Sequence, residues 1–171
     1  QLRTRLRSLP PLAKGQLWDV QEAAIRNLEA SFARNHPRAL IQMATGSGKT
    51  FTAASFAYRL IKFAGARRIL FLVDRANLGR QTLKEFQQFQ PPEERHTFDK
   101  LYNTAFPRKN HFDPINRVVV TTIQRLYSVL TGQPDLAEDD EDRSTFEGPG
   151  AFKKPPVPIT YLIGVPIENH T

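Results

Sequence analysis

The chain has 171 residues, of which 40% are hydrophobic, and this is the size of one globular domain with a sizeable core. It has no apolar run long enough to cross a bilayer and no apolar secretory segment at its start, so the sequence predicts a soluble, cytoplasmic protein without a membrane partner. The absence of cysteine excludes disulfides and thiolate metal sites. The histidines lack the spacing of zinc ligands; they are His36, His96, His111 and His170.

The net charge of +7 hides a stronger basic bias. Residues 132–147 contain seven acidic residues and one basic residue, which leaves 23 basic against 10 acidic residues in the rest of the chain. Such an excess favours a polyanionic partner, for which nucleic acid is the natural candidate. A basic surface that serves only solubility is the alternative, and charge alone leaves it open.

The first part of the chain reads as a linker followed by a helix. Residues 1–15 are basic and include Pro10 and Pro11, so they are predicted to be a basic linker. An apolar stripe at helical spacing predicts a helix that starts at Leu17 and ends before Pro37. The residues of this stripe are Val20, Ala24, Leu28 and Phe32.

Strands and helices are expected to alternate from residue 39 onward. Apolar runs predict strands at residues 39–43, 68–73 and 117–121, and a weaker pattern predicts one more at 96–102. Helical spacing predicts helices that run from Lys49 to Gly65, through 78–86, and through 123–130. This alternation favours an α/β fold in which helices flank a parallel sheet.

The composition changes after residue 130. Residues 131–158 are rich in Gly, Pro and acids and are predicted to form an exposed insertion or loop between a domain at 16–130 and a truncated C-terminal segment at 159–171. That last segment contains a possible short strand at 159–163. The acidic run 139–142 follows no buried apolar strand, so a solvated loop is favoured over Mg²⁺ ligands.

One glycine-rich turn indicates a phosphate-binding loop. It lies between a predicted strand and a predicted helix and reads Met43-Ala44-Thr45-Gly46-Ser47-Gly48-Lys49-Thr50. The glycines allow successive amides to turn inward around phosphate oxygens, the lysine can reach the β- and γ-phosphates, and the threonine hydroxyl can ligate Mg²⁺. Met43 stands where the general P-loop pattern has a glycine, and a flexible turn without a ligand is the alternative interpretation. We expect ATP and Mg²⁺ as cofactors.

Four segments together resemble the first RecA-like lobe of superfamily 2 helicases, and most closely the motor subunit of type I restriction enzymes. The resemblance spans residues 17–158, and in this superfamily the leading glycine of the loop is commonly replaced. The segments are 17–25, 43–50, 71–81 and 119–127.

The resemblance implies roles for individual residues. Gln21 matches the glutamine that reads the adenine edge, the phosphate loop residues Thr45 to Thr50 bind nucleotide, and Lys49 and Thr50 are the catalytic pair. The residues that match DNA-contacting positions are Asp74, Arg75, Arg80, Gln81, Thr121 and Thr122. The competing interpretations are an exposed helix residue for Gln21, a helix cap with solvated arginines for the 74–81 segment, and a plain N-cap for the threonines.

Several parts of such a motor are not found in the sequence, namely the Asp-Glu box, the coupling motif, the second lobe with its arginine fingers, and the nuclease region. The sequence therefore predicts the ATP-binding part of an ATP-dependent DNA translocase or helicase from a type I restriction system, read as a fragment whose own ATP turnover is uncertain. The implied partners are double-stranded DNA and the specificity and methyltransferase subunits. A small P-loop nucleotide kinase, or a non-catalytic nucleic-acid-binding module with a vestigial loop, remain the alternatives.

Overall fold

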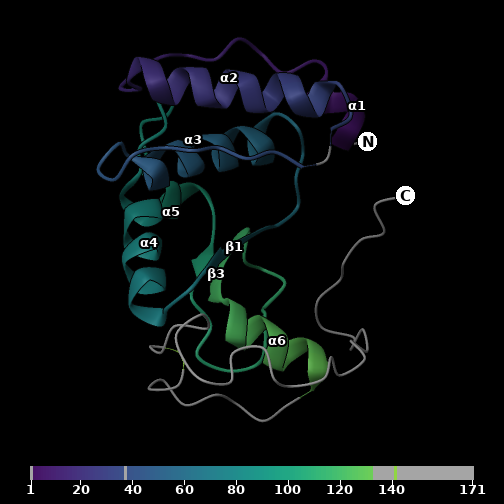
Figure 1. Cartoon of the computed structure of the whole chain (residues 1–171), viewed down its shortest axis with the longest axis vertical. Coiled ribbons are helices and arrows are strands. Elements are labelled where there is room, and N and C mark those ends of the chain that lie inside the picture. The colour runs from purple at the N-terminus through teal and green to yellow at the C-terminus, as the bar shows by residue number, and fades with distance from the viewer. Residues whose placement is uncertain (1, 37, 133–140, 142–171) are drawn as a thin grey trace. The chain divides into compact units, whose positions relative to one another are not determined.

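The computed structural model describes residues 2–36, 38–132 and 141 (Figure 1). The chain divides into two compact units. The first unit comprises Gln1–Ile69 and Lys84–Tyr102, and the second comprises Leu70–Leu83 and Asn103–Thr171. The helices are α1 (Leu2–Leu6), α2 (Asp19–Ala33), α3 (Lys49–Lys62), α4 (Ala76–Gln88), α5 (Phe98–Leu101) and α6 (Ile123–Thr131). The strands are β1 (Ile69–Val73), β2 (Thr104–Ala105) and β3 (Val118–Thr122).

Helices α2 and α3 form the centre of the first unit, where they lie side by side (Figure 1). Both helices were predicted and are confirmed, but the predicted stripe of α2 is not its buried face, because Val20 is 60% exposed and the buried residues are Gln21 and Ile25. Ile25 of α2 is fully buried, and α3 buries Ala54, Tyr58 and Ile61 on one face. A fully buried isoleucine side chain contributes about 1.5–3 kcal/mol, so Ile25 and Ile61 help to stabilise this unit.

The segment predicted as a basic linker is instead bound to the first unit. Residues 2–6 form the short helix α1, in which Leu6 is buried. The buried guanidinium of Arg59 donates to the carbonyl oxygen of Pro10 at 2.6 Å and to both carboxylate oxygens of Glu29 at 2.6 and 3.2 Å. One arginine thus ties the N-terminal segment, α2 and α3 together.

A second polar cluster fixes the chain that follows α4. The Tyr58 hydroxyl donates to Glu94 Oε1 at 2.9 Å, and the Lys62 ammonium binds both groups. Burial raises the pKa of the Tyr58 hydroxyl to about 12. The hydrogen bond from Lys62 lowers the pKa of Glu94, and the bond to Glu94 raises the pKa of Lys62. The cluster joins the last turn of α3 to residue 94.

The strand predicted at residues 96–102 is wrong, because residues 98–101 form helix α5 and the short strand β2 comes only afterwards. The reason lies in aromatic packing. Phe98 is fully buried, and its ring lies 5.8 Å from that of Phe86, 6.4 Å from Phe89 and 5.2 Å from Tyr102. A helical turn brings Phe98 and Tyr102 onto the same side, so tertiary packing overrides the strand propensity of the segment.

The strand predicted at residues 39–43 is also wrong in this structure. These residues run without assigned secondary structure, Leu40 is 93% exposed, and no backbone hydrogen bond from their amides to another described residue is found. A β-strand forms only when its backbone groups make hydrogen bonds to an adjacent strand. An apolar run favours a strand but does not provide that adjacent strand.

The sheet has strand order β1-β3-β2, and all of it except Ile69 belongs to the second unit. Strand β2 pairs with β3 in parallel, with Thr104 opposite Val118 and Ala105 opposite Val119. All five residues of the central strand β3 are buried, as expected for a strand covered on both faces. Helix α6 follows directly and ends at Gly132 in the left-handed conformation. The predicted α/β fold with flanking helices is confirmed.

Candidate nucleotide-binding site

The phosphate loop has the backbone geometry that its glycines predict. Gly46 and Gly48 adopt φ angles of +79° and +76°, and Gly48 is the N-cap of α3. Side-chain-bearing residues rarely adopt this left-handed conformation. The loop is therefore a tight turn that leads directly into the positive end of the α3 dipole.

Most amides of this loop remain available. Ser47 uses its backbone N–H and its hydroxyl to bind the carbonyl oxygen of Ala44, at 3.3 and 2.6 Å. Within the described part of the chain, the backbone N–H groups of Gly46, Gly48, Lys49 and Thr50 donate to no carbonyl oxygen. Because these donors lie close together at a helix N-terminus, they form a site suited to an anion.

Lys49 and Thr50 place a cation and a hydroxyl at the same helix start. The exposed Lys49 ammonium lies over the loop, 3.0 Å from the carbonyl oxygen of Ala44 and 3.4 Å from that of Met43. Thr50 is half-buried in the first turn of α3. These groups suit a polyphosphate and its counter-cation, since an ammonium is a mobile point charge and a hydroxyl oxygen is a ligand for Mg²⁺.

Gln21 connects α2 to the loop. Its Oε1 accepts from the backbone N–H of Trp18 at 3.0 Å, and its Nε2 donates to the carbonyl oxygen of Ser47 at 2.9 Å. The C=O and N–H of a trans peptide point in opposite directions, so holding the Ser47 carbonyl toward Gln21 turns the Gly48 amide away from it. Gln21 is only 4% exposed, so the alternative of an exposed helix residue is wrong.

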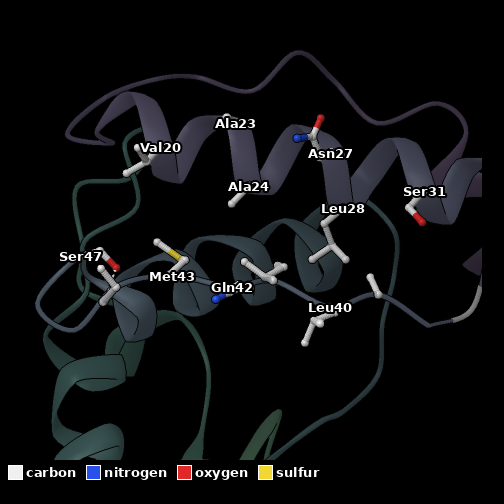
Figure 2. Close-up of a pocket in the computed structure, with 13 residues that line it drawn as sticks. Val20, Ala23, Ala24, Asn27, Leu28, Ser31, Leu40, Gln42, Met43 and Ser47 are labelled. Atoms are coloured by element: carbon white, nitrogen blue, oxygen red, sulfur yellow. Dashed lines mark hydrogen bonds between the residues drawn. The ribbon is translucent and has the colours of Figure 1, made fainter.

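A groove of about 690 Å³, lined by apolar and uncharged polar side chains, lies beside the loop in the first unit. Figure 2 shows Val20, Ala24 and Leu28 of α2 along one wall, with Met43 and Ser47 toward one end. Its lining includes no charged side chain among the described residues. A phosphate group would find no cationic side chain there, so the groove lies next to the anion site and is not its centre.

The predicted DNA-contacting residues differ in exposure. Arg75 follows β1, its side chain is 36% exposed, and its Nε lies 3.6 Å from the Asp74 carboxylate. Arg80 and Gln81 of α4 are exposed. Asp74 and Arg75 directly follow β1, and Arg80 and Gln81 lie in the next helix, α4.

Thr121 and Thr122 do not offer a surface to DNA in this structure, because both are fully buried. Thr122 is the N-cap of α6 and accepts from the backbone N–H of Arg125 at 3.1 Å, so it has the capping role that the alternative interpretation gave it. Direct contact of either hydroxyl with phosphate would require this region to open.

The acidic run was predicted to be solvated, and for Glu141 this is wrong. Glu141 is 1% exposed and forms a bidentate ion pair with the fully buried Arg125. Arg125 was missed as a special residue. The only local signal was a basic residue three positions after a threonine cap, inside a helix with no other charged residue.

Among the described residues there is no group of three or more metal-ligating side chains, and no helix long and apolar enough to span a membrane. The predicted strand at 159–163, and all of 131–158 except Thr131, Gly132 and Glu141, lie outside the described residues.

Comparison with known proteins identifies the family. A family model described as "Type III restriction enzyme, res subunit" matches residues 14–147. The chain is 35% identical over 106 residues to the "Type I restriction enzyme EcoKI endonuclease subunit" of Escherichia coli (strain K12), a match that covers 62% of this chain and 9% of that protein. It is 34% identical over 94 residues to the "Type I restriction enzyme SauCOLORF180P endonuclease subunit" of Staphylococcus aureus (strain COL), covering 55% of this chain and 10% of the relative.

A third relative gives a shorter match of higher identity. The chain is 43% identical over 70 residues to the "Type I restriction enzyme EcoAI endonuclease subunit" of Escherichia coli, which covers 40% of this chain and 9% of that protein. The matched region thus spans about a tenth of the length of these relatives. No solved structure matches significantly. The resemblance to restriction-enzyme motor subunits is confirmed. The chain belongs to the restriction-enzyme res-subunit family and has its P-loop, helicase-like α/β domain.

Proposed function

We propose that this chain is the ATP-binding part of an ATP-dependent DNA translocase or helicase in a type I restriction system. The observation that carries the proposal is the loop at residues 43–50, in which two left-handed glycines leave neighbouring amides available beside Lys49. Membership of a restriction-enzyme family supports the biological setting.

The loop residues fit Mg·ATP. The amides of Gly46, Gly48 and Lys49 would donate to phosphate oxygens, and the Lys49 ammonium would exchange its two loop carbonyls for the β- and γ-phosphates. Thr50 would hold Mg²⁺, which when bound neutralises charge on the phosphates. Gln21 retains one amide hydrogen and one acceptor lone pair for the adenine edge, since each end of its carboxamide makes one hydrogen bond.

DNA contact is proposed for the half-buried and exposed polar residues that follow β1. Arg75 and Arg80 would bind backbone phosphates, with Asp74 and Gln81 nearby in sequence. Such contacts carry no base specificity. The relatives are named endonuclease subunits, so we propose that this chain works together with the specificity and methyltransferase subunits of a restriction complex, in the cytoplasm where its DNA lies.

The test is calorimetric titration of Mg·ATP into the chain and into two lysine variants. Lys49→Ala should abolish binding, whereas Lys100→Ala, which removes an equal charge from a side chain 71% exposed elsewhere, should leave the affinity unchanged. Equal affinities in all three proteins would contradict the assignment of the loop.

Stimulation of ATP hydrolysis by DNA separates a motor from the alternatives. In a full-length motor subunit that includes this chain, duplex DNA should raise the rate of ATP hydrolysis. A nucleotide kinase would instead respond to a phosphate acceptor, and a module with a vestigial loop would bind DNA without binding ATP.

A further inference from the structure

An internal carboxylate occupies an anion-binding site at the start of α6 in the second unit. Glu141 Oε1 accepts from Thr122 Oγ1 at 2.8 Å and from Arg125 Nε at 2.7 Å, and its Oε2 accepts from Arg125 Nη2 at 2.8 Å. Both oxygens are bound, and the carboxylate is almost completely enclosed.

The donors around this carboxylate are those that proteins use for phosphate. A planar guanidinium binds carboxylate and phosphate oxygens in the same two-pronged manner, and an N-cap hydroxyl at a helix start adds a third donor. The site also lies at the carboxyl end of the central strand β3, the edge of an open α/β sheet where ligands commonly bind.

The donor groups of this anion-binding site are also held in place by residues other than Glu141. Arg125 Nη1 donates to Asn110 Oδ1 at 3.3 Å, and Asn110 Nδ2 in turn donates to Ser128 Oγ at 2.6 Å. The Thr122 hydroxyl accepts from the Arg125 backbone N–H. If the carboxylate left, the guanidinium and the hydroxyl would still be held in place.

A buried ion pair adds little to the net stability of a fold, because the cost of removing both charges from water offsets their attraction. Glu141 also belongs to a run of four acids, Asp139-Asp140-Glu141-Asp142, which would repel a polyanion. We propose that Glu141 is an autoinhibitory occupant of a phosphate site, and that a phosphate of the DNA backbone must displace it to reach Thr122 and Arg125. This inference rests on the proposed DNA-binding function.

The consequence is a lower apparent affinity for DNA. A ligand that binds only the open form has its dissociation constant raised by the inverse of the open fraction. Neutralising Glu141 should therefore tighten DNA binding, by about tenfold if the site is open in about a tenth of the molecules.

The experiment measures binding of a short DNA duplex at fixed salt to the full chain and three variants. Glu141→Gln should bind about tenfold more tightly than the unchanged chain. Glu93→Gln, which removes the same charge from an exposed position, should change affinity by less than about twofold, as expected of a single screened surface charge. The double variant Arg125→Met with Glu141→Leu replaces the pair by apolar residues without altering net charge, and it should not bind more tightly than the unchanged chain.

The inference is overturned if Glu141→Gln binds no better than Glu93→Gln, or if the double variant binds as tightly as Glu141→Gln. Absence of DNA binding by the unchanged chain and by every variant would instead overturn the proposed function as well.

A second measurement does not depend on a variant that folds. A protease that cleaves after glutamate should cut the unchanged chain faster at Glu141 when duplex DNA is present, because displacement exposes this residue. A parallel experiment with inorganic phosphate shows whether the site takes any phosphate or requires the DNA backbone. Cleavage at Glu141 that DNA leaves unchanged or slows would overturn the proposal.

Discussion

Replacing each loop glycine by alanine should separate backbone strain from the role of Gln21. Gly46 and Gly48 have nearly the same left-handed φ, so each substitution costs about 1–2 kcal/mol of strain. A Cβ at Gly46 would meet no atom within 4 Å, whereas one at Gly48 would collide with Gln21 Nε2. Moving that buried amide breaks its bond to Ser47, which adds about 0.5–1.5 kcal/mol.

The assay is urea denaturation of both glycine variants, each with and without Gln21→Ala. Gly48→Ala should lower the free energy of unfolding by about 1.5–3.5 kcal/mol, and Gly46→Ala by only about 1–2 kcal/mol. In the Gln21→Ala background the two values should become equal, because the collision is gone. Equal destabilisation by both substitutions, with no coupling between Gly48 and Gln21, would refute the reasoning.

Three further predictions concern stability. Arg59→Met should cost about 3–5 kcal/mol in chemical denaturation because it leaves the Glu29 carboxylate partly buried and unpaired, and adding Glu29→Leu should recover much of that loss. Phe98→Ala should cost about 3–5 kcal/mol by emptying a fully buried ring site, whereas a loss below about 1 kcal/mol would contradict the aromatic core. Lys62 lowers the pKa of Glu94, so this pair stabilises the fold above the ordinary glutamate pKa of about 4.3, and the stabilisation fades as pH falls through the lowered value. The difference in melting temperature between the unchanged chain and Glu94→Gln should therefore be constant near neutral pH and shrink in acid; a difference that grows in acid would be inconsistent.

The sequence predicts those elements whose signal is local. Helix α2 follows from its apolar stripe, strand β3 from a run of valines, and the glycine conformations of the loop from the phosphate-binding pattern. In each case neighbouring residues along the chain carry the information, so periodicity and turn chemistry suffice.

The errors arise where distant residues decide the structure. Residues 39–43 have strand composition but no partner strand among the described residues, and Phe98 is held in a helical turn by rings from other segments. Glu141 is buried where Arg125, 16 positions earlier, provides a matching charge and Thr122 a further hydrogen bond. Composition near residue 141 indicates a solvated acid, and nothing local reveals its partner.

The central claim is that the loop amides receive the phosphates of a nucleotide. The most direct test follows the backbone amide NMR signals of the loop while Mg·ATP, and separately tripolyphosphate, is added. The account predicts that the signals of Gly46, Gly48 and Lys49 shift strongly with both ligands, since the phosphates and not the base contact them. Signals that stay in place at these three residues while others shift would contradict it.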